Sequence, residues 1–212
     1  MAEIRPIDLV FTEAVKAAQT ANGAREICDR PGMSRAFKAD ITPDLAAFVA
    51  ERDSFYFGTA SADGRPYIQH RGGTPGFLKV IDEHTLAFAD YPGNKHYVTV
   101  GNLSENDRAF IFLMDYTNRR RIKVWGRART VDDNPGLLEK LKSDDVPIPP
   151  ERAVVFVVDA WNVNCQQYIR RRYAEEDVKR VVDALTRRIA ELETEVETLR
   201  RASADVAAPP PA

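Results

Sequence analysis

The sequence predicts a mainly β protein of the α+β class, an antiparallel barrel of six to seven strands with N-terminal helices and a C-terminal coiled-coil helix. Short strand-like segments follow one another at close spacing and are mostly joined by hairpin-type turns, which favours an antiparallel barrel. No GxGxxG motif stands between a strand and a helix, so a dinucleotide-binding parallel sheet is disfavoured. A seven-residue apolar repeat near the end of the chain predicts the coiled coil.

The composition fits a folded protein of a reducing compartment. Of 212 residues, 44% are hydrophobic, which is enough to build a core. Thirty Lys and Arg against 32 Asp and Glu give a net charge of −2, so we expect no nucleic-acid partner. Two cysteines without a Cys/His cluster predict neither a disulfide framework nor a metal site. The sequence shows no apolar segment of the length that a signal peptide or membrane span needs, and we expect a cytoplasmic protein without a membrane partner.

The N-terminal segment, residues 1–41, is predicted to be helical. Its composition from Asp8 to about Asp29 is rich in Ala, Glu and Lys, and residues 33–41 are predicted to form a loop. A short helix is then expected over Pro43–Glu51, because Thr42 suits the N-cap and Pro43 the first turn.

The central region, residues 42–165, carries the predicted strands. Hairpin signals and short apolar or alternating runs define them, and a helix is expected between them at Asn94–Leu103. The predicted strands are Ser54–Ala60, Pro66–Arg71, Phe77–Ile81, Leu86–Ala89, Ala109–Met114, Arg121–Thr130 and Ala153–Ala160.

The C-terminal region, residues 174–202, has an apolar seam with alternating spacings of four and three. The seam consists of Val178, Val182, Leu185, Ile189, Leu192, Val196 and Leu199. β-Branched residues at a and Val or Leu at d favour two parallel strands, and we expect a homodimer. A helix packed on its own barrel is the alternative. Pairing within a barrel dimer and linkage of two dimers both stay open, and residues 203–212 are predicted to be a disordered tail.

The first stretch with candidate chemistry is Gln69–Phe77, which places three glycines and a proline in strand territory. Glycine inside a strand often marks a bulge or the close approach of a ligand or another backbone. The stretch is therefore a candidate rim where backbone amides and Arg71 meet a flat anionic ligand. A wide hairpin loop is an equally good interpretation.

The second stretch, Gly93–His96, is predicted to open the helix. Free N–H groups at a helix N-terminus favour anions, and Lys95 adds a full positive charge, so this stretch is a candidate phosphate site.

In the third stretch, alternation sends Arg121, Lys123 and Trp125 to one strand face. Such a face could hold a phosphate or a ring, although a solvated strand face is the more common meaning of a charge run. No nucleophile elbow, P-loop or HExxH motif is present. An enzyme with this sequence is therefore expected to take its chemistry from a cofactor, and no catalytic residue is assigned.

Together these stretches resemble the FMN-binding split-barrel family of pyridoxamine 5′-phosphate oxidase-like proteins, over about residues 42–165. The sequence is most similar to a branch with the patterns HRGGxPGFL and GN[KR]. The matching segments are Ser54–Ala60, Ala62–Tyr67, Gln69–Val80, Thr85–Asp90, Gly93–Lys95, Gly101–Leu103, Phe112–Asp115 and Trp125–Ala128.

The resemblance implies a homodimer of split barrels with two FMN sites at the subunit interface. It places Arg71 and Lys79 on the strand that lines the flavin and its phosphate. It places Asn94, Lys95 and His96 beside the phosphate, with His96 in place of a second cation. Arg121 falls near the carbonyl and N1 edge of the flavin ring. The cofactor-binding residues that we predict on this basis are His70, Arg71, Gly72, Lys79, Asn94, Lys95, His96 and Arg121.

The function that the resemblance implies is an FMN-dependent oxidoreductase that transfers a hydride or electrons to or from a small organic substrate, with NAD(P)H as a candidate donor. The Arg-x-His-x-Arg pattern that holds the vitamin substrate in the oxidases is missing, and Tyr168 stands where the branch has a histidine. True pyridoxamine 5′-phosphate oxidase activity is one alternative. Another is a non-catalytic flavin- or haem-binding module with a coiled-coil arm, whose haem ligands would be His70, His84 or His96. A deazaflavin in place of FMN is a third.

Overall fold

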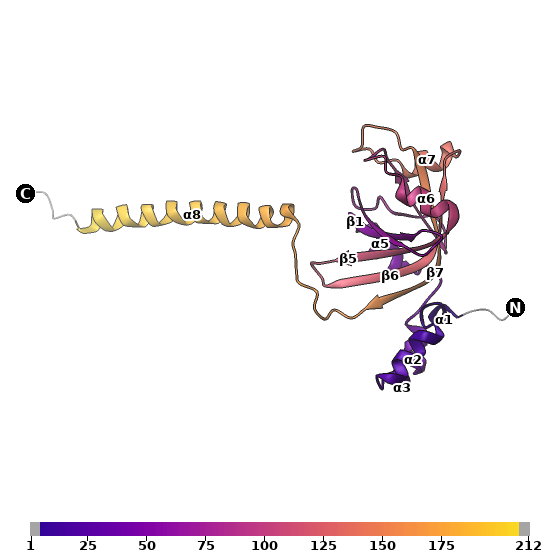
Figure 1. Cartoon of the computed structure of the whole chain (residues 1–212). Helices are drawn as coiled ribbons and strands as arrows, with labels where there is room; N and C mark the ends of the chain where they lie inside the picture. Colours follow the sequence, from indigo (N-terminus) through magenta and orange to yellow (C-terminus); the bar gives the residue numbers. More distant parts are fainter. Residues whose placement is uncertain (1–4, 208–212) are drawn as a thin grey trace, which may run out of the picture. The chain divides into compact units, whose positions relative to one another are not determined.

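The structure is a computed structural model that describes residues 5–207, without the side chains of residues 202 and 204–207. The chain divides at residue 169 into two units, each described here by itself (Figure 1). The elements of the first unit are α1 (Pro6–Val10), α2 (Glu13–Ala21), α3 (Arg25–Cys28), α4 (Pro31–Arg35), α5 (Pro43–Ala50), β1 (Ser54–Ala60), β2 (Pro66–Gly72), β3 (Lys79–Val80), β4 (Thr85–Asp90), α6 (Val98–Glu105), β5 (Arg108–Asp115), β6 (Arg120–Val131), α7 (Pro135–Leu141) and β7 (Arg152–Asn164). The second unit contains α8 (Glu175–Ala207).

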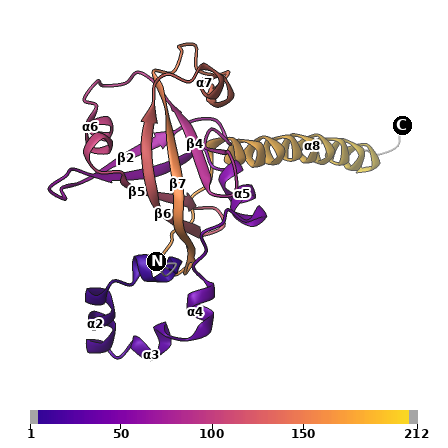
Figure 2. The ribbon, with the colours of Figure 1, turned by 90° about the vertical axis from the view of Figure 1, so that its right-hand side faces the viewer.

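The first unit is built around one antiparallel sheet of seven strands in the order β2-β1-β5-β6-β7-β4-β3 (Figure 2). The long strands β6 and β7 pair along most of their length, with one bulge between Trp125 and Gly126. The sheet confirms the predicted α+β class with seven antiparallel strands.

Side chains close the sheet into a split barrel between the β1–β2 hairpin and β4. Phe55 and Phe57 of β1 contact the ring of Phe88 on β4, with ring centroids 5.2 and 5.6 Å apart. Arg71 of β2 donates a hydrogen bond to Asp90 at the end of β4 over 2.5 Å. Because β4 is not paired through its backbone with β1 or β2, this junction has room for cavities.

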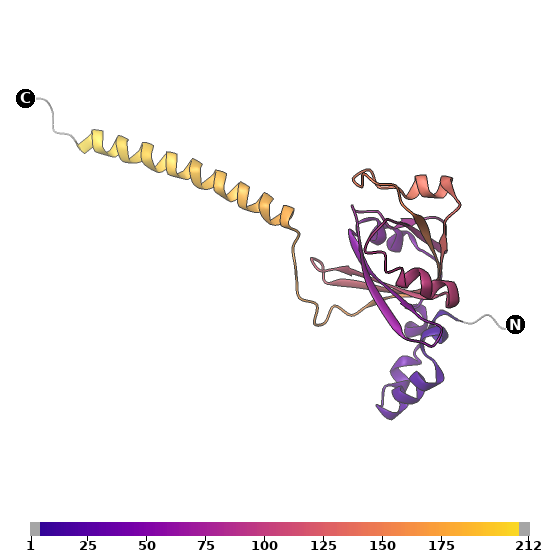
Figure 3. The ribbon, with the colours of Figure 1, turned by 45° about the horizontal axis from the view of Figure 1, so that its top comes forward.

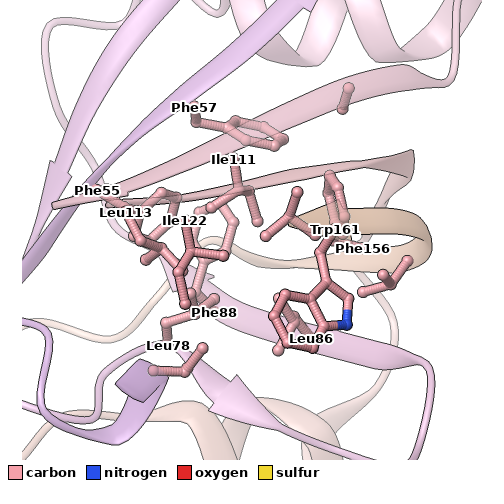
Figure 4. Packing of buried hydrophobic residues seen from close by; sticks show 14 of the residues in the cluster. Phe55, Phe57, Leu78, Leu86, Phe88, Ile111, Leu113, Ile122, Phe156 and Trp161 are labelled. Atoms are coloured by element: carbon pink, nitrogen blue, oxygen red, sulfur yellow. The ribbon is translucent and has the colours of Figure 1, made fainter. Parts of the chain in front are cut away.

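The core lies inside the rolled sheet and is capped by α5. Alternate residues of β1, β5 and β6 point inward, as the two-residue period of a strand requires. Figure 4 shows side chains of this core. The largest fully buried side chains among the described residues are Phe48, Phe55, Phe57, Phe88, Phe156, Leu45, Leu78, Leu86, Ile111, Leu113, Ile122 and Leu141, the last in a separate cluster with Ala87, Ala153 and Val155.

The helix expected over residues 8–29 is in fact several short helices, and the loop expected over 33–41 begins inside α4. Thr12 accepts a hydrogen bond from the backbone N–H of Val15 and so starts α2 anew. Gly23 has a φ of 66°, which ends α2. Pro31 then starts α4. The Ala-rich composition therefore predicted helix correctly but missed the caps that divide it.

Three further boundaries differ from the sequence predictions. The strand expected over Phe77–Ile81 is reduced to the two residues of β3. Helix α6 begins at Val98, four residues later than expected. Helix α7 was not predicted, although Asn134 caps it by accepting from the backbone N–H of Leu137 and Pro135 suits its first turn. Figure 3 shows α7 and α6 beside the sheet.

In the second unit, α8 is one uninterrupted helix whose range contains the predicted seam. It extends five residues beyond the predicted end at residue 202. The rest of the predicted tail, residues 208–212, lies outside the described residues. No helix among residues 5–207 has both the length and the apolar character that crossing a membrane requires.

Asp115 at the end of β5 is a buried carboxylate with an expected effect on acid stability. Burial disfavours its ionised form most strongly, but hydrogen bonds from the backbone and side chain of Asn118, at 2.9 and 2.8 Å, outweigh it. With the charges of Arg52 and Arg120 they lower the pKa of Asp115 below its ordinary value of 3.8.

Because the folded-state pKa is the lower one, ionised Asp115 stabilises the fold above the unfolded pKa of about 3.9, and this stabilisation is lost as the pH falls through the folded value. We expect Asp115→Asn to be less stable than the parent at pH 7, and the difference to shrink below about pH 4. Urea unfolding at pH 7 and pH 3 measures it. An equal difference at both pH values would contradict the assignment.

Candidate functional site

A polar cavity of about 190 Å³ lies beside β2, the end of β4 and the start of α6. Strand β2 contributes Tyr67, Gln69 and Arg71 to it. These residues share one face because strand side chains alternate, and they are the less exposed half of the strand. The loop before α6 contributes Asn94, Lys95 and His96.

The loop before α6 holds its shape through local backbone contacts. Asn94 Oδ1 accepts a hydrogen bond from the backbone N–H of His96 over 3.1 Å. Lys95 and Tyr97 have φ values of 59° and 50°, in the left-handed region that costs a non-glycine residue of the order of 1–3 kcal/mol. Strain of this kind persists only where the surrounding structure imposes it, and it is concentrated at binding sites.

The prediction that Asn94, Lys95 and His96 open the helix is wrong in position, because Tyr97 is the N-cap and α6 starts at Val98. The two left-handed residues explain the delay, since they cannot belong to a right-handed helix. The first turn of α6 still lines the cavity. Thr99 in this turn is buried and donates to Gln69 Oε1 over 3.2 Å, which fixes the helix against β2.

A chain of charged groups lies beside the cavity, and Arg71, Asp90 and Glu151 of this chain line it. Asp90 lies between Arg71, 2.5 Å away, and Arg152, whose Nε is 3.9 Å from the other carboxylate oxygen. Arg152 also contacts Glu151 over 3.2 Å, and Glu151 accepts a hydrogen bond from the hydroxyl of Tyr97 over 3.1 Å. This hydrogen bond, burial and the charge of Glu151 raise the pKa of Tyr97 above its ordinary value of 10.0.

Arg71 and Tyr91 line both this cavity and a second one. The second cavity, of about 220 Å³, is more apolar and includes Phe77, Phe88 and Leu141 in its wall, with His70 and Gly72 beside Arg71. Within the described part of the chain, Arg71 Nε is buried without a hydrogen-bond partner. An anion at this point could satisfy a donor that the protein itself leaves unpaired.

One glycine of the Gln69–Phe77 stretch, Gly73, has a packing reason as well. A Cβ at Gly73 would lie 2.8 Å from Cγ of Phe77, so no larger residue fits without moving that ring. The close approach that the sequence predicted is therefore made, at this position, by a side chain of the protein.

The structure thus brings together six of the eight predicted cofactor-binding residues. Arg71, Asn94, Lys95 and His96 line the polar cavity, and His70 and Gly72 line the apolar one. Lys79 is exposed on β3 and lines neither of them.

Arg121 also lines neither cavity, because it lies on the outer face of β6. Its alternation with Lys123 and Trp125 is as predicted. Burial and the positive charge of Arg121 lower the pKa of Lys123 below its ordinary value of 10.5.

Sequence reasoning missed the acidic side of the site. Asp90 was only the last residue of a segment that resembles the family, and neither Glu151 nor Arg152 had a predicted role. A signal was available for Asp90, because a carboxylate that ends an apolar strand is expected to be buried with a cation.

The predicted haem ligands do not converge. His96 lines the polar cavity and His70 the apolar one, while His84 is in the turn before β4, 3.6 Å from Asp40.

A flavin nucleotide fits this chemistry. Lys95 and Arg71 supply positive charge for a phosphate, and the aromatic wall of the second cavity supplies an apolar surface for a ring. Each cavity alone is smaller than the roughly 300–1,000 Å³ of a typical cofactor pocket, but the two adjoin at Arg71 and Tyr91.

The rolled sheet and the cavities at its junction define a split-barrel protein. Residues 41–165 match the family model described as pyridoxamine 5′-phosphate oxidase, and the chain belongs to this family. No curated protein matches the chain.

Several solved structures are similar in fold at low identity. HupZ of Group A Streptococcus is 16% identical, with a TM-score of 0.48, over 59% of this chain and 98% of its own. An FMN-binding protein of Syntrophomonas wolfei is 16% identical, with a TM-score of 0.47, over 70% and 97%. A putative pyridoxamine 5′-phosphate oxidase of Lactobacillus delbrueckii is 16% identical, with a TM-score of 0.46, over 58% and 94%. These three likenesses carry no information about the substrate.

Proposed function

We propose that the protein is an FMN-binding oxidoreductase that exchanges a hydride or electrons with a small organic substrate. The observation that carries the proposal is the position of Arg71, a cation with a free buried donor at the boundary of a polar and an apolar cavity. Membership of the pyridoxamine 5′-phosphate oxidase family supports it.

In this proposal, the residues of the polar cavity hold the phosphate. Arg71 and Lys95 provide the positive charge, and Asn94 keeps the loop in shape through its hydrogen bond to the backbone of His96. FMN, when bound, supplies the redox chemistry, and the protein supplies binding, orientation and electrostatics.

We further propose that the working form is a homodimer. Arg121 is on the outer face of β6, and the two cavities of one chain are small, so a second copy of the chain would complete the site. In that arrangement Arg121 would meet the ring from the other subunit, where a cation stabilises an anionic reduced flavin. NAD(P)H is the proposed donor.

The first experiment is an absorption spectrum of the purified protein, followed by denaturation and identification of any released chromophore. The expected result is a flavin spectrum and free FMN. A Soret band would show that the cofactor is haem and not FMN. A protein that stays colourless after incubation with FMN would overturn the proposal. Release of a deazaflavin would mean that the same site binds a deazaflavin in place of FMN.

Replacement of Lys95 by alanine tests the phosphate site. Loss of a charged hydrogen bond of about 1.5–3 kcal/mol is expected to raise the FMN dissociation constant about ten- to hundred-fold. Flavin fluorescence titration measures it.

Lys140→Ala is the matched control for Lys95→Ala. Lys140 is an exposed lysine in the last turn of α7 that lines neither cavity, and its variant should bind FMN as the parent does. Equal affinities of the two variants would place the phosphate elsewhere.

A further inference from the structure

Within the described residues of its own unit, 170–207, the apolar stripe of α8 has no partner. Its seven seam residues are between 42% and 60% exposed, although four of them are β-branched and three are leucines. An amphipathic helix of this kind gains most of its stability by covering the stripe. In the 4-3 pattern Val182, Ile189 and Val196 occupy the a positions, and Val178, Leu185, Leu192 and Leu199 occupy the d positions.

The charges beside the stripe distinguish between possible partners. Arg188 and Glu195 occupy consecutive g positions, and Glu193 and Arg200 occupy the e positions five residues after each of them. In a parallel pair of helices in register, each g residue faces the following e residue of the other helix. Arg188 then meets Glu193 of the second copy, and Glu195 meets its Arg200. Both contacts join opposite charges, and two-fold symmetry doubles them.

We propose that α8 binds α8 of a second copy of this chain as a parallel, in-register, two-stranded coiled coil. β-Branched residues at a with leucine at most d positions favour two strands over three or four. The proposal concerns the second unit alone and stands whether or not the barrel binds a flavin.

Disulfide cross-linking of the full-length chain tests the orientation. Cys28 and Cys165, both free, are first replaced by serine. Val178→Cys and Leu199→Cys are then made separately at the two ends of the stripe. Under mild oxidation, each variant is expected to cross-link to itself. A mixture of the two should give no mixed product, because the positions are about 30 Å apart along the helix.

Every other pattern of cross-links overturns the proposal. An antiparallel pair would give the mixed product, and neither variant would cross-link to itself. A helix that packs on its own barrel, or on a different protein, would give no disulfide between two copies. A sedimentation mass of three chains would exclude a two-stranded assembly.

Charge reversal tests the register independently. In the Leu199→Cys background, Glu195→Arg or Arg200→Glu alone turns two attractive contacts into repulsive ones. In a glutathione redox buffer, each is expected to lower the effective concentration of the introduced thiols about ten-fold. The double reversal should restore it, since the charges are exchanged across the same contacts. Failure to restore it would exclude the proposed register.

Arg187→Glu is the matched control, because it makes the same charge change at an f position, on the side of the helix away from the seam. It should leave the effective concentration of the thiols unchanged. A ten-fold loss in this variant as well would mean that net charge, and not the g–e contacts, determines the pairing.

Discussion

Replacement of Asp90 by asparagine is expected to lower the free energy of unfolding by about 3 kcal/mol. Asp90 is 7% exposed, and Arg71 and Arg152 both face it. Arg152 keeps Glu151 and Asp132 as partners when the carboxylate is lost. Among the described residues, Arg71 has no second ion pair, so the variant leaves its guanidinium mostly buried and uncompensated. An unpaired buried charge of this kind accounts for most of the expected loss.

The same ion pair joins the two strands that close the barrel, because Arg71 is on β2 and Asp90 is on β4. Urea unfolding of the flavin-free protein at pH 7 measures the effect. Asp159→Asn is the matched control, since it removes a partly exposed aspartate 3.5 Å from Arg127, whose side chain is 57% exposed. Exposed pairs contribute about 0–1 kcal/mol, so this variant should stay close to the parent. Similar losses in both variants would show that the Arg71–Asp90 pair is no better shielded from water than a surface pair.

The strands of the barrel could be predicted because the residues that favour each strand lie within one short stretch of sequence. Ser54–Ala60 is strand-like in composition and is followed by a hairpin signal, and Ala153–Ala160 is an apolar run of strand length. The structure places β1 and β7 over these residues. The repeat in α8 is equally local, since three to four heptads define it without any other part of the chain.

Helix boundaries were harder to predict because single residues determine them. The left-handed conformations of Lys95 and Tyr97 move the start of α6 toward the C-terminus, and neither lysine nor tyrosine is a residue type from which a positive φ is predicted. In the N-terminal segment, Thr12 and Pro31 start new helices within a composition that favours a continuous one. Composition reports the average tendency of a segment, whereas caps act at one position.

Only the basic residues of the candidate site could be predicted from the sequence. Arg71 and Lys95 stand out beside glycines, and the resemblance to a known family directed attention to them. The pairing of Asp90 with Arg71 and of Glu151 with Tyr97 is recognised only when the chain has folded, because these partners are distant in sequence and the contacts depend on how the sheet rolls. Arg121 shows the opposite problem, since a pattern placed it correctly on a strand face but could not show that this face lies outside the barrel.

Gly126→Ala is expected to lower the free energy of unfolding by about 3 kcal/mol or more, the upper range for overpacking. Gly126 follows the bulge between β6 and β7, where the backbones approach closely. A Cβ there would lie 2.1 Å from the carbonyl oxygen of Val157 and 2.6 Å from Cε1 of Phe156. Phe156 is fully buried in the core, so its ring has little room to move, and the carbonyl belongs to a paired strand.

Gly58→Ala provides the matched control, because Gly58 is also in a paired strand but has ordinary space around it. Its added Cβ would lie 3.5 Å from Cβ of Phe110, a normal van der Waals distance. Alanine also loses less conformational freedom on folding than glycine, so this variant should stay within about 1 kcal/mol of the parent. Urea unfolding of both variants gives the comparison. If Gly126→Ala were as stable as Gly58→Ala, β6 and β7 would have to lie further apart at the bulge than the 2.6 Å between the added Cβ and Phe156 Cε1 allows.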